Sequence, residues 1–173
     1  EDKDIVILCH DDLDIGSTRA EFIAALASCL EVGAGIVGPA GTTLLGVDAV
    51  WWDHERWKKG YHSGEVYHPD KKTNTFHVTS YGPNKKVVVL DGLFLCASAK
   101  TLRTIGLEKP DYLLGDWDFY DIHYTFTAFS SGLSNITVPI KIAHYSTGEL
   151  VGRDGWNNNR LAFIQKHQLP ARI

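Results

Sequence analysis

Three aspartates that follow an apolar run near the start of the chain are the first residues whose type and spacing could do chemistry. Residues 5–9 have the length and apolar character of a buried strand. Asp11, Asp12 and Asp14 come just after it, and in open α/β sheets ligands bind where strands end. Because Mg²⁺ and Mn²⁺ prefer oxygen ligands, the cluster predicts a metal and phosphate site. A solvated turn with a helix cap explains this stretch equally well.

A second acidic group lies at residues 115–123. Asp118 and Asp121 are about one helical turn apart, just before a predicted helix at residues 124–129 that ends at Gly132. Two carboxylates there could act on a substrate, but a helix dipole also stabilises acids at a helix start without any catalytic purpose. This structural explanation is stronger for Asp118 than for Asp121, which lies further in, between large apolar neighbours.

Two further polar positions stand at predicted strand ends. A β-branched strand over residues 86–90 stops at Asp91-Gly92, where glycine would let a ligand approach the backbone closely. Asp91 could equally cap the helix that follows. An alternating strand over residues 136–143 ends at His144, which could bind a metal or be a hydrogen-bonded loop residue.

The elements that must position these side chains have clear signals in the sequence. Thr18 and Glu21 form a capping box ahead of apolar residues at helical spacing, and they predict an amphipathic helix that ends near Gly33. Residues 34–41 have the pattern of a short buried strand that opens into a glycine-rich turn. A strand, a helix and a strand in this order favour parallel pairing and an α/β fold. A final helix is predicted over residues 156–165.

The segment at residues 47–83 lacks this regularity and is rich in aromatic side chains. A long irregular segment inside a compact domain is more often a functional loop than filler. Flat aromatic surfaces beside polar groups suit stacking on a sugar or a base, so we expect the segment as a whole to bind ligand. Any single Trp there is better explained as an anchor of the loop. The aromatic residues are Trp51, Trp52, Trp57, Tyr61, Tyr67 and Tyr81.

The composition bounds the class of protein. A chain of 173 residues with 44% apolar composition can bury one sizeable core, so a single domain over residues 1–173 is expected. The net charge of -4 argues against a nucleic-acid clamp, which needs a surplus of Lys and Arg. Three cysteines inside apolar runs argue against a disulfide framework, and no apolar stretch reaches transmembrane length. These features fit a cytoplasmic location.

Five stretches, taken in order, resemble the family 2 glycosyltransferases of the GT-A fold, and within them a short bacterial and phage branch. They are His10-Asp11-Asp12, the turn at residues 36–41, Val89-Leu90-Asp91-Gly92, Asp118-Phe119-Tyr120-Asp121-Ile122 and Ile142-Ala143-His144-Tyr145-Ser146, with Trp156 in the closing helix. The resemblance spans nearly the whole chain. It implies a GT-A-like (Rossmann-like) α/β fold, with a mixed sheet flanked by helices.

The resemblance implies a metal site of the DxD type. Asp12 matches the best metal ligand, with Asp11 beside it on the sugar or the metal. Strict DxD spacing selects Asp12 and Asp14, so Asp14 is a second candidate, and His144 matches a position that completes the metal shell in several such enzymes. The ion would be Mn²⁺ or Mg²⁺ on the diphosphate of a nucleotide-sugar, with a UDP-sugar favoured.

The same resemblance implies direct displacement at the anomeric carbon of the sugar, with inversion favoured. Asp121 matches the base that takes the proton from the acceptor hydroxyl, and Asp118 is the fallback. Asp91-Gly92 matches the acceptor side, and Trp156 would shape the sugar or acceptor pocket. The alternatives are a non-catalytic carbohydrate-binding module on the same fold and a metal-dependent phosphohydrolase.

One departure from the family pattern concerns the donor side. In that fold an N-terminal half of alternating strands and helices holds the nucleotide and precedes the acidic strand, whereas only residues 1–4 precede it here. The resemblance therefore implies a minimal or N-terminally truncated form. Either a missing segment or a second chain supplies the nucleotide-binding half, or this protein does without it.

Overall fold

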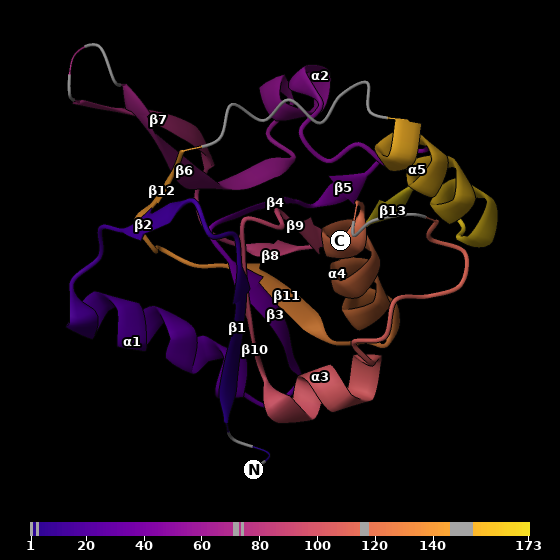
Figure 1. Cartoon of the computed structure of the whole chain (residues 1–173), viewed down its shortest axis with the longest axis horizontal. Helices are drawn as coiled ribbons and strands as arrows, with labels where there is room; N and C mark the ends of the chain where they lie inside the picture. Colours follow the sequence, from indigo (N-terminus) through magenta and orange to yellow (C-terminus); the bar gives the residue numbers. More distant parts are fainter. Residues whose placement is uncertain (1, 3, 71–72, 74, 115–117, 146–153) are drawn as a thin grey trace.

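In the computed structural model, the described strands combine into three sheets flanked by helices (Figure 1). The structure describes residues 2, 4–70, 73, 75–114, 118–145 and 154–173. The mixed sheets and their flanking helices confirm the predicted α/β fold. Within the described ranges, the helices are all too short or too polar to cross a membrane.

The first sheet contains the strand that leads to the aspartates. Its order is β1 (Ile5–Cys9), β10 (Phe94–Ser98), β3 (Ala34–Gly38), β11 (Ser134–Thr137) and β8 (Lys86–Val87). The predicted parallel pairing of β1 with β3 is wrong, because β10 lies between them and runs antiparallel to both. The prediction of a buried β1 is also wrong, because this edge strand alternates between half-buried and exposed side chains.

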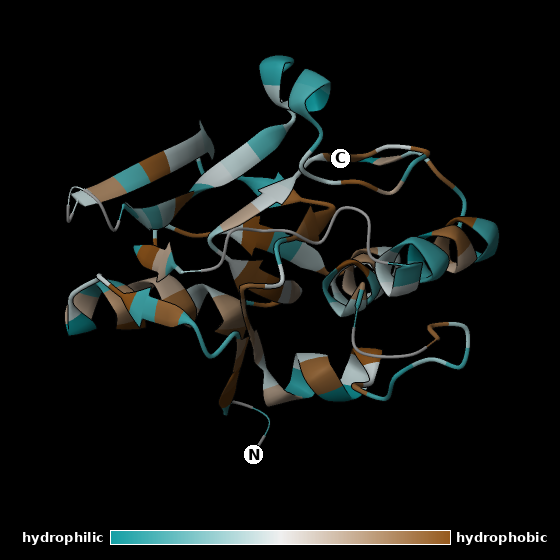
Figure 2. Ribbon diagram, turned by 45° about the horizontal axis from the view of Figure 1, so that its top comes forward, coloured by the Kyte–Doolittle hydropathy of each residue, from teal (hydrophilic) through white to brown (hydrophobic). Residues whose placement is uncertain are grey.

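The inner strands of this sheet send alternate side chains into two hydrophobic cores, as the period of a strand requires. On β10, Cys96 joins the core beside α1 (Arg19–Ala27), which continues as a 3₁₀ turn over Ser28–Leu30. Leu95, its neighbour, joins the core beside α3 (Ala99–Ile105). Figure 2 shows brown, apolar strands in the middle of the molecule, with helices of mixed colour around them.

The second sheet contains most of the remaining strands. Its order is β2 (Leu13–Ile15), β12 (Ile142–His144), β6 (His62–Asp70), β4 (Ala40–Thr42) and β9 (Val89–Leu90), with β7 (Thr75–Gly82) paired to β6. β6 and β7 form a long antiparallel hairpin, and α2 (His54–Lys58) precedes it. The prediction that residues 47–83 are irregular is therefore wrong over most of their length. Gly64, Pro69 and Asp70 are unfavourable in β6, so pairing with neighbouring strands supports it, whereas β7 also contains strand-favouring residues such as Val78 and Tyr81.

Several segments pass from the first sheet into the second within a few residues. Val88 separates β8 from β9, and residues 138–141 separate β11 from β12, so the single strands predicted at residues 86–90 and 136–143 are each two strands. Pro139, which has no N–H to donate, falls in the second break. Because of these breaks, polar residues at strand ends gather between the two sheets.

Two helices, α1 and α4 (Tyr120–Ser130), begin at residues for which the sequence makes predictions. The capping box is confirmed, since the N–H of Glu21 donates to Oγ1 of Thr18 (3.3 Å) and the carboxylate of Glu21 accepts from the N–H of Thr18 (2.8 Å). α4 begins earlier than predicted, after Phe119 in the left-handed region at φ 75°. Asp121 therefore lies in the first turn of α4.

The C-terminal part packs beside α4 (Figure 1). α5 (Asp154–Lys166) confirms the predicted final helix. After it, β13 (Ala171–Arg172) pairs antiparallel with β5 (Leu44–Leu45) to form the third sheet.

Candidate metal site and carboxylate pair

The loop after β1 and the end of β12 come together between the two larger sheets. His10 directly follows β1, and Asp12 directly precedes β2. His144 is the last residue of β12 and lies opposite Leu13 in the antiparallel pairing of β2 with β12. The carbonyl oxygen of Asp12 accepts the N–H of Tyr145 at 3.0 Å and extends this pairing. The register of β2 on β12 therefore places Asp12 beside His144.

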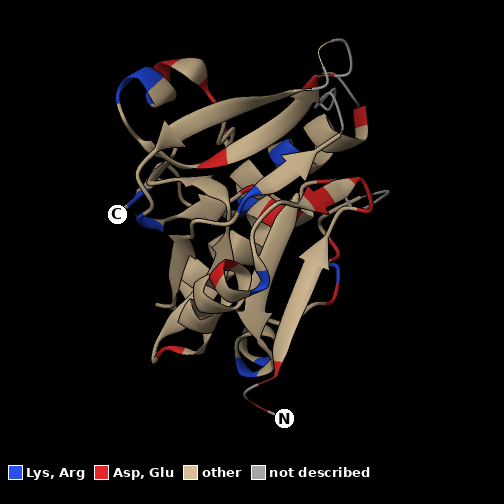
Figure 3. Cartoon of the chain, turned by 90° about the vertical axis from the view of Figure 1, so that its left-hand side faces the viewer, with Lys and Arg blue, Asp and Glu red and all other residues tan. Residues whose placement is uncertain are grey.

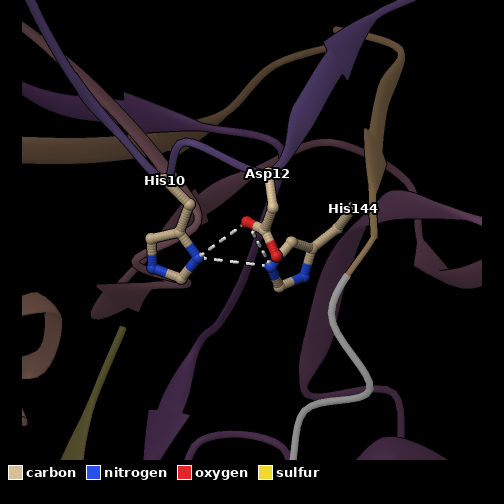
Figure 4. A group of neighbouring side chains, drawn as sticks. All are labelled: His10, Asp12 and His144. Carbon is tan, nitrogen blue, oxygen red and sulfur yellow. Dashed lines mark hydrogen bonds and ion pairs between the residues drawn. The ribbon is translucent and has the colours of Figure 1, made fainter.

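The side chains of His10, Asp12 and His144 point toward one another (Figure 4). Nδ1 of His10 lies 3.2 Å from Nε2 of His144. Oδ1 of Asp12 lies 3.4 Å from Nε2 of His144 and 3.8 Å from Nδ1 of His10. Burial lowers the pKa of His144, although the charge of Asp12 opposes this effect. The imidazole of His144 is therefore neutral at pH 7, and a ring nitrogen can offer its lone pair.

This donor set fits a divalent transition-metal ion. The three ligand atoms all lie within 4.8 Å of one another, and each residue is half-buried. Two imidazole nitrogens and a carboxylate oxygen suit Mn²⁺, Fe²⁺, Co²⁺ or Zn²⁺, whereas Mg²⁺ prefers oxygen ligands alone. Residues 10–15 contain three aspartates and no Lys or Arg, so the local charge also favours a cation (Figure 3).

Two of the predicted aspartates lie outside this cluster. Asp11 is exposed. Oδ2 of Asp14 instead accepts a hydrogen bond from the hydroxyl of Tyr145 at 2.6 Å. The structure therefore brings Asp12 to His144 and leaves the other two carboxylates apart from them.

His10 is a candidate ligand that the sequence reasoning did not select. Its place at the end of a strand, directly before two aspartates, was the available signal. Its partner, His144, is 134 positions away in the sequence. Only the packing of the two sheets brings the two rings to a centroid distance of 5.2 Å.

A second polar group surrounds Gly92, just after β9. The N–H of Gly92 donates to Oδ2 of Asp121 (3.2 Å), and the N–H of Leu93 donates to Oδ1 of Asp91 (3.2 Å). A Cβ at residue 92 would lie 2.7 Å from Cβ of Asp121 and 2.7 Å from the hydroxyl oxygen of Tyr120. The close approach predicted at this glycine is therefore made by side chains of α4.

Both carboxylates hold a proton more tightly than an ordinary aspartate does. Burial, followed by the charge of Asp121, raises the pKa of Asp91 to about 7. Burial also raises the pKa of Asp121 to about 6, while backbone N–H groups, including that of Gly92, oppose this effect. A pair of carboxylates that titrates near neutral pH is typical of sites that do acid–base chemistry.

Tyr120 connects the carboxylate pair to the histidines. Its hydroxyl donates to the carbonyl oxygen of Gly92 at 2.7 Å and lies 3.0 Å from Nε2 of His10. Burial raises the pKa of Tyr120, so the hydroxyl keeps its proton. A continuous path of contacts therefore runs from His144 through His10, Tyr120 and Gly92 to Asp121.

Asp118 lies where the segment before α4 meets α5. Its carbonyl oxygen accepts from Nδ2 of Asn159 at 2.8 Å, and Oδ1 of Asn159 accepts from the N–H of Leu114 at 2.6 Å. The fully buried Asn159 therefore connects Leu114, just before the second acidic group, to Asp118 within it. The charge of Asp118 adds to the effect of burial in raising the pKa of Asp121.

Trp156 is packed into the core. It is only 5% exposed, and its ring lies 5.4 Å from that of Trp52 and 5.5 Å from that of Phe119. Trp51 is 2% exposed, whereas Trp57 is 37% exposed. Trp51 and Trp156 are therefore turned inward, and the contact between Trp52 and Trp156 joins the start of residues 47–83 to α5.

A family model described as "Glycosyltransferase like family" matches residues 2–166. No curated protein matches the sequence. The matched range contains every residue of the two polar groups described above.

Proposed function

This chain belongs to a glycosyltransferase-like family, and from this premise we propose that it uses a divalent metal ion to transfer a sugar from a nucleotide-sugar to an acceptor hydroxyl. The observation that carries the proposal is the path from His144 to Asp121. One end of this path offers ligands for a cation, and the other offers a carboxylate with a raised pKa. These are the two kinds of group that metal-dependent transfer requires.

We assign the metal to His10, Asp12 and His144. A divalent ion held there would offset the negative charge that develops on the departing diphosphate. Since two of the three ligands are imidazoles, Mn²⁺ is favoured over Mg²⁺. Asp11, exposed beside Asp12, is the candidate to contact the donor sugar. A UDP-sugar is the first donor to test.

Asp121 is our candidate for the general base. It would accept the proton of the acceptor hydroxyl while the hydroxyl oxygen attacks the anomeric carbon. The bond to the diphosphate would break on the opposite face, which inverts the configuration. With a pKa of about 6, the carboxylate is ionised at neutral pH and is still more basic than an ordinary aspartate. Asp91 is a candidate for binding the acceptor, and Asp118 is the second candidate for the base.

Calorimetric titration tests the metal assignment. The wild-type chain should bind Mn²⁺ more tightly than Mg²⁺, and Mn²⁺ should strengthen the binding of UDP. Asp12→Asn should weaken Mn²⁺ binding by at least about tenfold. Asp14→Asn should not, because the carboxylate of Asp14 accepts from Tyr145. An equal loss in both variants, or no binding of Mn²⁺ to the wild type, contradicts the assignment.

Turnover tests the base and the reaction. With a UDP-sugar, Mn²⁺ and an acceptor, Asp121→Asn should lower kcat by about 10²- to 10⁴-fold while the affinity for Mn²⁺ is kept. A larger loss in Asp118→Asn would make Asp118 the base instead. Free sugar in place of transferred sugar would identify a hydrolase. Glycan binding that survives loss of Asp12 and Asp121, with no turnover by the wild type, would identify a binding module.

A further inference from the structure

We infer that Tyr120 is a positioning residue: together with the carbonyl group of Gly92 it selects the tautomer of His10 and turns the lone pair of Nδ1 toward Asp12 and His144. This inference rests on the proposed function in one respect: the lone pair of Nδ1 is assigned to the proposed metal ion. The tautomer itself follows from the hydrogen bonds alone.

The protons along the contact path can be counted. The carbonyl oxygen of Gly92 can only accept, so the one hydrogen of the Tyr120 hydroxyl is donated to it at 2.7 Å. Nε2 of His10, 3.0 Å from the same hydroxyl oxygen, must then be the donor in their hydrogen bond. A neutral imidazole carries a single N–H, so Nδ1 of neutral His10 carries a lone pair and no proton.

That lone pair lies on the atom that faces the cluster. Nδ1 of His10 is the nitrogen 3.2 Å from Nε2 of His144 and 3.8 Å from Oδ1 of Asp12. A histidine that binds a metal normally donates its other ring N–H to an oxygen acceptor, which fixes its tautomer and ring orientation. The hydroxyl oxygen of Tyr120 is such an acceptor.

The backbone of Gly92 forms hydrogen bonds with both Tyr120 and Asp121. Its carbonyl oxygen accepts from Tyr120, while its N–H donates to Asp121, the next residue of α4. A Cβ at this position would lie 2.7 Å from the Tyr120 hydroxyl. One backbone position therefore sets the orientation of a metal ligand through Tyr120 and the orientation of the candidate base directly.

Nitrogen NMR of the metal-free chain tests the tautomer without any assumption about activity. With ¹⁵N-labelled histidine, and the signals of His10 assigned by their loss in His10→Gln, His10 should show a protonated Nε2 and an unprotonated Nδ1 at pH 7.5. In Tyr120→Phe the share of this tautomer should fall. A neutral His10 that carries its proton on Nδ1 in the wild type overturns the inference.

Titration with Mn²⁺ and Co²⁺ tests the consequence for metal binding. Tyr120→Phe should bind these ions about 10- to 100-fold more weakly than the wild type. Tyr124→Phe is the matched control, because the hydroxyl of Tyr124 also donates from α4 to a backbone carbonyl, that of Leu107, at 2.7 Å. This control should bind like the wild type.

These measurements distinguish the proposed metal site from the positioning role of Tyr120. Equal affinities in Tyr120→Phe and Tyr124→Phe overturn the positioning role and leave the metal site standing. Failure of the wild type to bind either ion overturns the proposed metal dependence, and the NMR measurement on the wild type still decides the tautomer. If Tyr120→Phe does not fold, NMR on the wild type still tests the inference, because a proton on Nδ1 of neutral His10 would overturn it.

Discussion

Replacing Asp121 with asparagine should make the folded chain more stable than the wild type, and the advantage should grow as the pH rises. Burial raises the pKa of Asp121 to about 6, against 3.8 for an ordinary aspartate. Asparagine has nearly the same shape, and its side-chain oxygen can accept the Gly92 N–H that Asp121 accepts at 3.2 Å. The substitution therefore removes a charge and keeps the packing.

The sign of the effect follows from proton binding. Because the pKa of Asp121 is higher in the folded state, the stabilisation that its proton provides is complete below about pH 4 and is lost as the pH rises through about 6. A difference of about two pH units corresponds to about 3 kcal/mol. Roughly half of this, about 1.5 kcal/mol, develops between pH 5 and pH 8. The asparagine variant has no carboxyl group to ionise, so its advantage should grow by that amount.

Urea unfolding at pH 5, 6.5 and 8, followed by tryptophan fluorescence, measures the effect. Asp53→Asn is the control, because Asp53 caps α2 and the N–H of Arg56 lowers the pKa of Asp53. The stabilisation from a group with a lowered pKa is lost only at acidic pH, below its usual pKa. The control should therefore differ from the wild type by a constant amount between pH 5 and 8. A flat or shrinking advantage for Asp121→Asn would refute the reasoning.

Three further outcomes follow from the same geometry. Gly92→Ala should lower the free energy of unfolding by about 1–3 kcal/mol in urea, because the new Cβ would lie 2.7 Å from two side chains of α4. Gly16→Ala is the control: the nearest atom to its Cβ lies at 3.6 Å, so the change should stay within about 0.5 kcal/mol. Asn159→Ala should cost about 2–3 kcal/mol by the same assay, and it should speed hydrogen exchange at the start of α4, because two buried hydrogen bonds are lost. The kcat/KM for sugar transfer should rise as the pH increases through about 6, where Asp121 ionises, and a decline over that interval would exclude Asp121 as the base.

Local signals in the sequence predicted the features that depend on neighbouring residues. The capping box at Thr18 and Glu21 and the final helix are present as expected. The strand β6 escaped prediction because it contains Gly64, Pro69 and Asp70, which are unfavourable in strands, and because its partner β12 is far away in the sequence. The strand-favouring residues of β7 were a signal that the prediction missed. The separation of β8 from β9 also depends on tertiary structure, because the chain changes sheets at Val88.

The sequence by itself determined which chemical groups stand at strand ends and helix starts, and its resemblance to a family placed Asp12, Asp121 and His144 among the candidate site residues. The tertiary structure decided which of these groups meet. It placed Asp14 on Tyr145, turned Trp156 into the core and brought His10 to His144 across 134 positions. The physical reason is that strand order and register depend on the packing of the whole chain. A residue's type fixes its chemistry, but only the register fixes its partner.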